Sequence, residues 1–189
     1  MQVEETELEG CYVIIPRIFR DKRGEFFESF NQDKFEELTG VNPNFIQDNQ
    51  SISHKNVLRG LHFQIGDYAQ AKLVRVISGS VLDVVVDIRP NSKTFGRYIA
   101  LVLDNQTNKQ LYIPRGMAHG FLTLEDHTIF SYKCDNYYNK ASERGIIFND
   151  KSIGIDWNED GASLIVSEKD LVLPTLEEYF HEDSISHGR

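Results

Sequence analysis

Two short segments of this sequence combine charged side chains with hydrophobic residues, and both have the residue types needed for proton transfer. The first, NVLRGLHFQ, places Arg59 and His62 among valine, leucine and phenylalanine. Histidine is the side chain best suited to removing a proton near neutral pH. The second, QAKLVR, puts Lys72 on the same pleat face as Val74 and Val76. An ammonium group inside a protein requires an anion or a developing negative charge. The alternative is a lysine at a strand end that reaches solvent.

A third segment, IPRGMAHGF, contains Pro114, Gly116 and His119. This PxGxxH spacing matches the second sequence motif of cupin β-barrels. Metal-binding cupins complete their site with a first motif of the type HxH followed by a glutamate. Here the corresponding segment has His62 alone, with no glutamate at the usual distance. Two imidazoles without a carboxylate make a poor site for a divalent ion, so we expect no metal ion.

Tyr132 and a carboxylate of the segment SEKD near the C-terminus are further candidates for acid–base chemistry. The alternation along TIFSYKC puts Tyr132 on the same strand face as Thr128 and Phe130. A tyrosine among inward residues either hydrogen-bonds a neighbour or, across a cavity from a histidine, donates a proton. The segment Ser167-Glu168-Lys169-Asp170, near the C-terminus, offers a carboxylate that could orient a histidine.

Aromatic, arginine and amide side chains gather nearer the N-terminus, in FRDKRGEFFESF and FIQDNQ. Such groups suit a nucleotide through ring stacking, phosphate pairing and hydrogen bonds to a base edge. They are equally compatible with an ordinary amphipathic hairpin. The sequence contains neither GxGxxG nor GxxxxGK(S/T), which excludes a Rossmann or P-loop nucleotide site as far as motifs can.

The elements that must position these side chains are mainly β-strands. Glycine, proline and asparagine recur at short intervals between 60 and 116, which is typical of a sandwich or barrel. The clearest strand is Val81–Ile88, with Leu82, Val84, Val86 and Ile88 on one face and Val81, Asp83, Val85 and Asp87 on the other. Ser78-Gly79-Ser80 predicts a hairpin. Further strands are predicted at 71–78, 98–103, 110–114 and 128–134.

Helices are few. The segment Asn31–Leu38 has an N-cap residue in Asn31 and a stop signal in Gly40, and a second short helix is predicted at Leu176–Phe180. A chain of 189 residues suits one domain, which we expect to span 1–180. The tail 181–189 has little to bury and is expected to be flexible.

Composition narrows the class of protein. With 40% hydrophobic and 26% charged residues, global disorder is excluded. The net charge of −9 argues against nucleic-acid or anionic-membrane binding, and no hydrophobic run is long enough to span a membrane. The N-terminus lacks the layout of a secretory signal, and Cys11 and Cys134 belong to no metal or redox motif. We therefore expect a cytoplasmic enzyme or binding domain.

Taken together and in order, these segments resemble the dTDP-4-dehydrorhamnose 3,5-epimerase family of dTDP-sugar biosynthesis. The similarity runs from about Val13 to Pro174. It rests on RGEFFESFN, FIQDN, NVLRGLHFQ, KLVRVISGSVLDVVVDIR, TFG, IPRGMAHGF, YKC with the following YY, SERGI, NDKSIGIDW and VSEKD. The resemblance implies a cupin-type jelly-roll β-barrel, a homodimer, a dTDP-sugar substrate and no cofactor.

The resemblance also implies a role for each matching residue. His62 would be the base that removes a sugar proton, with Asp170 paired to it. Tyr132 would be the acid on the opposite face, and Lys72 the cation beside the enolate oxygen. Tyr138 and Phe26 would flank the thymine. The other substrate-contacting positions would be Arg23, Glu28, Gln47, Asn49, Arg59, His119, Glu143 and Lys169.

The expected reaction inverts C3 and C5 of a 4-keto-6-deoxyhexose, whose ketone acidifies both neighbouring C–H bonds. A histidine base, a carboxylate that orients it, a fixed cation and a neutral tyrosine meet the four requirements of that chemistry. Two alternatives remain open from the sequence. One is an epimerase that inverts only C3 or only C5. The other is a non-catalytic cupin that binds sugar nucleotides.

Overall fold

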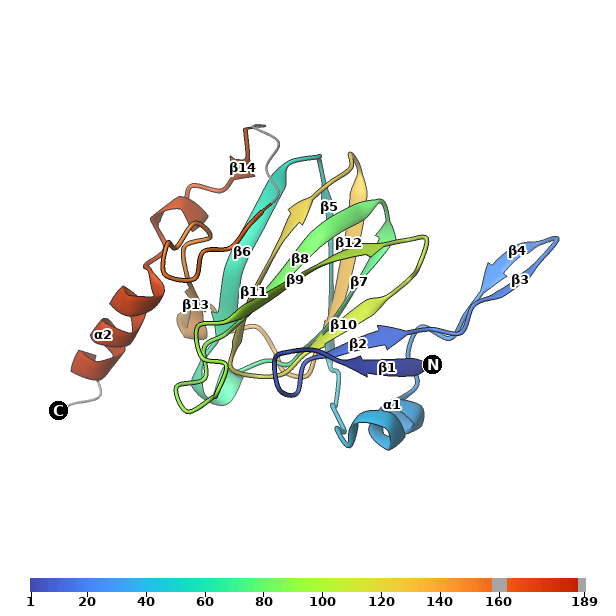
Figure 1. Ribbon diagram of the computed structural model, residues 1–189, viewed down its shortest axis with the longest axis horizontal. Helices are drawn as coiled ribbons and strands as arrows, with labels where there is room; N and C mark the ends of the chain where they lie inside the picture. Colours follow the sequence, from blue (N-terminus) through green and yellow to red (C-terminus); the bar gives the residue numbers. More distant parts are fainter. Residues whose placement is uncertain (158–162, 187–189) are drawn as a thin grey trace.

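Two antiparallel sheets face each other and enclose the centre of the molecule (Figure 1). The computed structural model describes residues 1–157 and 163–186. The first sheet has the order β1 (Gln2–Glu5), β2 (Tyr12–Ile15), β10 (Gln110–Ile113), β7 (Lys72–Ser78), β12 (Thr128–Cys134) and β5 (Gln47–Ser53). The second has the order β13 (Glu143–Gly145), β6 (Val57–Gln64), β11 (Met117–Thr123), β8 (Ser80–Asp87) and β9 (Tyr98–Asp104), and β14 (Ile165–Val166) also pairs with β6. The predicted mainly β, jelly-roll class is confirmed.

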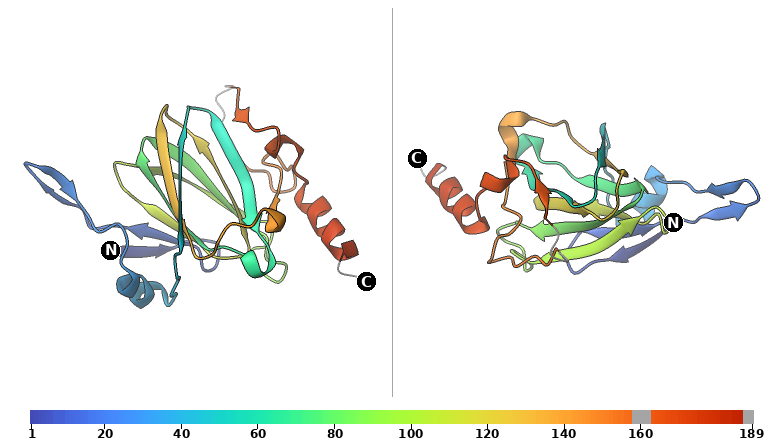
Figure 2. Two further views of the ribbon diagram at one scale, coloured as in Figure 1. Left: turned by 180° about the vertical axis from the view of Figure 1, so that it is seen from behind. Right: turned by 90° about the horizontal axis from the view of Figure 1, so that it is seen from above.

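Strand β8 shows how the sequence builds two layers of core. Its Val81 and Val85 are fully buried between the sheets, in a cluster with Phe121 and Phe130. The alternate residues Leu82, Val84 and Val86 belong to a second cluster that contains Trp157 and Leu176. The segment around Trp157 and the helix α2 (Leu176–Ser186) therefore cover the outer face of the second sheet (Figure 2). The predicted alternation of β8 is confirmed, with both faces buried.

The predicted hairpin at Ser78-Gly79-Ser80 is wrong. Strand β7 belongs to the first sheet and β8 to the second, so the chain crosses between the sheets at this point. Gly79 adopts φ +81, and a side chain there would clash with Thr128. The glycine thus allows a tight corner between two sheets, and turn residues alone do not distinguish such a corner from a hairpin.

Both predicted helices are present. In α1 (Gln32–Thr39) the Asn31 side chain accepts the backbone N–H of Lys34, and Gly40 ends the helix at φ 70. Helix α2 begins at Leu176 as predicted but continues to Ser186, so part of the tail expected to be loose is helical. Residues 187–189 of that tail lie outside the described residues. Short 3₁₀ turns occur at η1 (Gly66–Tyr68), η2 (Lys140–Ser142) and η3 (Asp170–Val172).

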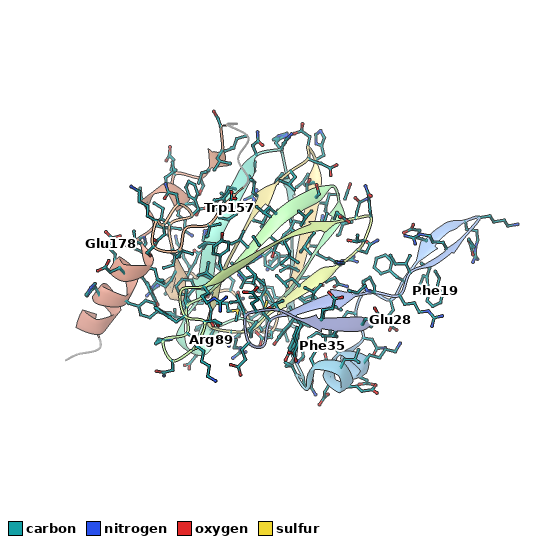
Figure 3. The ribbon with its side chains drawn as sticks, in the orientation of Figure 1. Phe19, Glu28, Phe35, Arg89, Trp157 and Glu178 are labelled. Atoms are coloured by element: carbon teal, nitrogen blue, oxygen red, sulfur yellow. The ribbon has the colours of Figure 1, made fainter. Side chains whose placement is uncertain are left out.

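A two-stranded arm of β3 (Phe19–Asp21) and β4 (Gly24–Phe26) projects from the barrel (Figures 1 and 3). All six residues of these strands are exposed, including Phe19 and Phe26 at 51% and 71%. An isolated hairpin of this size is marginally stable in water.

None of the described helices is long and apolar enough to cross a membrane.

The backbones of β6 and β11 approach closely where Gly60 faces Gly120. A Cβ atom on Gly120 would lie 2.7 Å from the carbonyl oxygen of Arg59 and 3.2 Å from the Cα atom of Gly60. This contact sets the spacing of the strands that carry His62 and His119, which are cross-strand partners.

Replacing Gly120 by alanine is expected to lower the free energy of unfolding by about 3 kcal/mol, because backbone atoms must shift to admit the methyl group. Gly40→Ala is the matched control. A Cβ there meets nothing within 4 Å, so only the strain of φ +70 remains, about 1 kcal/mol. Urea unfolding of the two variants measures both changes, and equal losses would contradict the steric explanation.

Candidate active site

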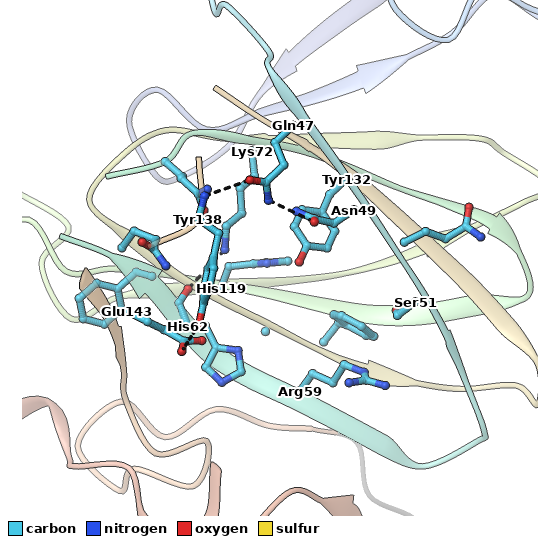
Figure 4. A pocket seen from close by; sticks show the side chains of 16 residues that line it. Gln47, Asn49, Ser51, Arg59, His62, Lys72, His119, Tyr132, Tyr138 and Glu143 are labelled. Atoms are coloured by element: carbon cyan, nitrogen blue, oxygen red, sulfur yellow. Dashed lines mark hydrogen bonds between the residues drawn. The ribbon is translucent and has the colours of Figure 1, made fainter. Parts of the chain in front are cut away.

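A cavity of about 530 Å³ opens between the two sheets (Figure 4). The first sheet contributes Gln47, Asn49, Ser51, Lys72 and Tyr132 to its wall. The second contributes Arg59, His62, His119, Phe121 and Glu143. Residues far apart in the chain therefore meet around one space that is large enough for a sugar-sized ligand.

His62 points into the cavity and is paired with a carboxylate behind it. Its Nε2 atom lies 2.7 Å from Oδ1 of Asp170, which the 3₁₀ turn η3 places against β6. The second carboxylate oxygen accepts the backbone N–H of Gly60, at 3.4 Å. Burial raises the pKa of Asp170, but the His62 hydrogen bond and charge outweigh it and hold the pKa below its usual range. The pairing fixes the orientation of the imidazole ring.

Lys72 lies on the inner face of β7, in line with Val74 and Val76 as the pleat predicted. Its Nζ atom donates to the carbonyl oxygen of His62, at 3.5 Å. Desolvation lowers the pKa of Lys72, while Cys134, Asp83 and Glu143 act in the opposite direction. The ammonium group therefore lies next to His62 in a poorly solvated site, where it would stabilise a developing negative charge.

Tyr132 approaches the cavity from the first sheet, opposite the sheet that carries His62. Its strand β12 pairs with β5 and β7, and Figure 4 shows its side chain across the cavity from His62. Burial raises the pKa of the Tyr132 phenol, assisted by Cys134 and opposed by the positive charge of Arg59. The phenol therefore keeps its proton at neutral pH and is available as a donor.

A second histidine–carboxylate pair lies beneath the cavity and was not predicted from the sequence. His119 is 6% exposed, and its Nε2 atom lies 3.0 and 3.2 Å from the two oxygens of the fully buried Asp83. Desolvation lowers the pKa of His119, although Asp83 acts to raise it. The available signal was an aspartate within a strand of valines, VLDVVVDI, and the alternation placed Asp83 on one face with Val81 and Val85 without a partner.

Polar side chains from the first sheet and from the loops complete one side of the cavity. Gln47 Nε2 donates to Asn49 Oδ1 at 3.1 Å, and Gln47 Oε1 accepts the backbone N–H of Tyr138 at 2.9 Å. The Tyr138 hydroxyl donates to Glu143, which also pairs with Lys169 at 2.5 Å. Burial raises the pKa of Glu143, but Lys169 and Tyr138 hold it below its usual range.

Arg59 lies near the other end of the cavity, where β5 and β6 are joined. Its guanidinium group donates to the hydroxyl oxygen of Ser53 at 3.3 Å, while the residue as a whole is exposed. Ser51, two residues before Ser53 in β5 and on the same strand face, also lines the cavity. Both serines were missed by the sequence reasoning, since a serine in a strand carries no distinctive signal.

The structure does not bring Arg23, Phe26 and Glu28 to the cavity of their own chain. Arg23 pairs with Asp21 in the exposed arm, and Glu28 accepts hydrogen bonds from Lys34 and Asn31. Figure 3 shows Glu28 at the base of the arm, away from the barrel. Their predicted contact with substrate is therefore not made within this chain.

No group of three or more histidine, cysteine or carboxylate side chains is arranged to hold a metal ion within residues 1–157 and 163–186. The two histidines of the cavity each direct a ring nitrogen at an aspartate instead. The cavity thus combines a paired histidine, an ammonium group and a protonated phenol. This set is suited to proton transfer at a carbon next to a carbonyl group.

The family model described as dTDP-4-dehydrorhamnose 3,5-epimerase matches residues 5–178. The chain belongs to this family. It is 53% identical to the dTDP-4-dehydrorhamnose 3,5-epimerase of Escherichia coli K12 over 178 residues, which cover 94% of the chain and 96% of that relative.

Solved structures of the family have the same fold. The dTDP-4-dehydrorhamnose 3,5-epimerase from Elizabethkingia anophelis NUHP1 superposes with a TM-score of 0.91 at 50% identity, covering 94% of this chain and 97% of that one. The Legionella pneumophila Philadelphia 1 enzyme, in complex with dTDP-4-keto-L-rhamnose, gives a TM-score of 0.89 at 42% identity, with 93% of each chain covered. The expected resemblance to this family is confirmed.

Proposed function

We propose that this family member is an isomerase that converts dTDP-4-dehydro-6-deoxy-D-glucose to dTDP-4-dehydro-L-rhamnose by inverting C3 and C5. The sequence identity of 50–53% to relatives named dTDP-4-dehydrorhamnose 3,5-epimerase supports this reaction. The observation that carries the residue-level mechanism is a paired histidine and a protonated tyrosine on opposite walls of one cavity.

We propose that His62 is the base. It removes the proton from C5 or C3, and the electron pair of the broken C–H bond moves into an enolate with its charge on O4. Asp170, 2.7 Å from the other side of the ring, stabilises the imidazolium that forms. The negative charge of Asp170 stabilises the positive charge that the imidazole gains, so the barrier to removal of the sugar proton is lower.

Lys72 is the proposed partner of the enolate oxygen. Its only hydrogen-bond acceptor among the described residues is the His62 carbonyl oxygen, at the long distance of 3.5 Å. A cation that is fixed beside O4 but weakly paired in the free enzyme stabilises charge that grows in the transition state. His119 also lines the cavity and is held by Asp83, which supports a second contact between His119 and the sugar.

Tyr132 is the proposed acid. Because it approaches from the sheet opposite His62, it delivers a proton to the face that the base did not deprotonate, and the carbon is inverted. Solvent then returns a proton to the phenolate and removes one from the imidazolium. Tyr138, Gln47, Asn49, Arg59, Glu143 and Lys169 are the proposed contacts to the rest of the dTDP-sugar.

Replacing the acid and the base should separate the two halves of the reaction. His62→Asn is expected to abolish turnover and deuterium exchange at C3 and C5. Tyr132→Phe is expected to lose about 10²–10⁴-fold in inversion while some exchange persists, because the base still operates. NMR of the sugar in deuterated water measures both. Wild-type exchange in His62→Asn would identify another base.

The pH profile should report Lys72 on its alkaline side. Burial lowers the pKa of Lys72 and raises that of Tyr132, so the ammonium loses its proton first as the pH rises. The fall in kcat/KM should therefore begin below pH 10.4, the usual value for lysine. In Lys72→Arg the remaining activity should persist to higher pH, since a guanidinium stays charged. An unchanged alkaline limb would assign the fall to another group.

We also propose that the protein is a homodimer and acts in the cytoplasm. The exposed aromatic arm supports a dimer, because a partner's surface would cover Phe19 and Phe26 and bring Arg23 and Glu28 to a second cavity. Two free, buried cysteines are consistent with a reducing compartment. Sedimentation equilibrium should give twice the chain mass at micromolar concentration, and a single-chain mass would contradict the dimer.

A further inference from the structure

A directional chain of hydrogen bonds runs along the wall of the cavity and ends on a thiol. The backbone N–H of Tyr138 donates to Gln47 Oε1 at 2.9 Å, and Gln47 Nε2 donates to Asn49 Oδ1 at 3.1 Å. Asn49 Nδ2 then donates to Sγ of Cys134 at 3.6 Å. Figure 4 shows the first two of these bonds.

Cys134 is at the end of β12 and is completely buried. It continues the inward face of Phe130 and Tyr132, and its cross-strand partners are Gln47 on β5 and Lys72 on β7. Burial raises the pKa of the thiol, so Cys134 is uncharged at neutral pH. In this protonated form the sulfur is a weak hydrogen-bond acceptor.

The chain fixes how both amide groups are turned. A backbone N–H can only donate, so the Gln47 oxygen must face Tyr138 and its NH₂ group must face Asn49. The Asn49 oxygen accepts from that group, which leaves the Asn49 NH₂ group directed at residue 134. Without an acceptor there, the Asn49 NH₂ group loses its partner, and only the bond from Gln47 still holds the amide in place.

We propose that Cys134 is a positioning residue for nucleotide binding, which acts through Asn49 and Gln47 on Tyr138. The inference rests on the proposed function, because it concerns the affinity of the same cavity for its dTDP-sugar. Tyr138 is held at its backbone by Gln47 and at its hydroxyl by Glu143, so its half-exposed ring is presented to the cavity in one orientation. Loosening the backbone contact impairs binding of the nucleotide, while the residues of the proton transfer keep their own partners.

The test uses three single variants of the full-length protein, with dTDP as the probe in titration calorimetry. Cys134→Ala removes the acceptor and should weaken dTDP binding about fivefold, the effect of one neutral hydrogen bond. Cys134→Ser restores an acceptor and should stay within about twofold of the wild type. The control is Cys11→Ala, since Cys11 is equally buried but is not the sulfur that accepts from Asn49. It should leave dTDP affinity unchanged.

Steady-state kinetics separate this role from an effect on Lys72. Cys134→Ala should raise KM about fivefold and change kcat by less than about twofold. A loss in kcat with KM unchanged would mean that Cys134 acts on its neighbour Lys72, and the proposal would be wrong. If Cys134→Ala fails to fold, Cys134→Val, which also lacks an acceptor, takes its place.

A double-mutant cycle with Asn49→Ala tests the route. If Cys134 acts through Asn49, Cys134→Ala should have no further effect on dTDP affinity once the Asn49 amide is gone. Additive losses, or equal losses in the serine and alanine variants, would overturn the proposal. Wild-type protein that binds dTDP but does not invert the sugar would instead refute the proposed function and leave the result on Cys134 standing.

Discussion

The rest of the structure depends on the cost of placing charged groups between the two sheets of the barrel. Desolvation acts on the ionisable side chains of the cavity, and partners offset it for most of them. His62 is paired with Asp170, His119 with Asp83, and Glu143 with Lys169. Lys72 has only a distant carbonyl oxygen among the described residues. This imbalance leaves a desolvated cation beside His62, the proposed base, as an enolate oxygen would require.

The fold meets this constraint by arranging side chains in layers. The alternation of β8 sends Asp83 inward beneath His119, while its other face packs under α2 and the segment around Trp157. The close contact of Gly60 and Gly120 brings β6 and β11 together, so that the two histidines are cross-strand partners. Asp170 reaches His62 because η3 packs against β6, with the Gly60 N–H directed at the same carboxylate.

Local pattern was sufficient for most strands, for α1 and for the face that Lys72 shares with Val74 and Val76, because pleat and cap signals are short-range. It left open whether the Lys72 ammonium group stays inside or reaches solvent. It failed at Gly79, since a turn signal does not reveal which sheet the next strand joins. The proximity of Asp170 to His62 spans 108 positions in sequence and came only from the family resemblance. Asp83 was missed because one aspartate among valines does not reveal its partner. The positions of Arg23, Phe26 and Glu28 relative to a substrate do not follow from one chain. The arm with Arg23 and Phe26, and its base with Glu28, lie away from the cavity of their own chain.

The central claim is that one base and one acid on opposite walls invert two carbons of the same sugar. Incubation of the wild-type protein with dTDP-4-dehydro-6-deoxy-D-glucose in deuterated water, followed by NMR of the product, tests it most directly. The account predicts deuterium at both C3 and C5 and the L-rhamno configuration at both carbons. Deuterium and inversion at one carbon alone, or at neither, would contradict it.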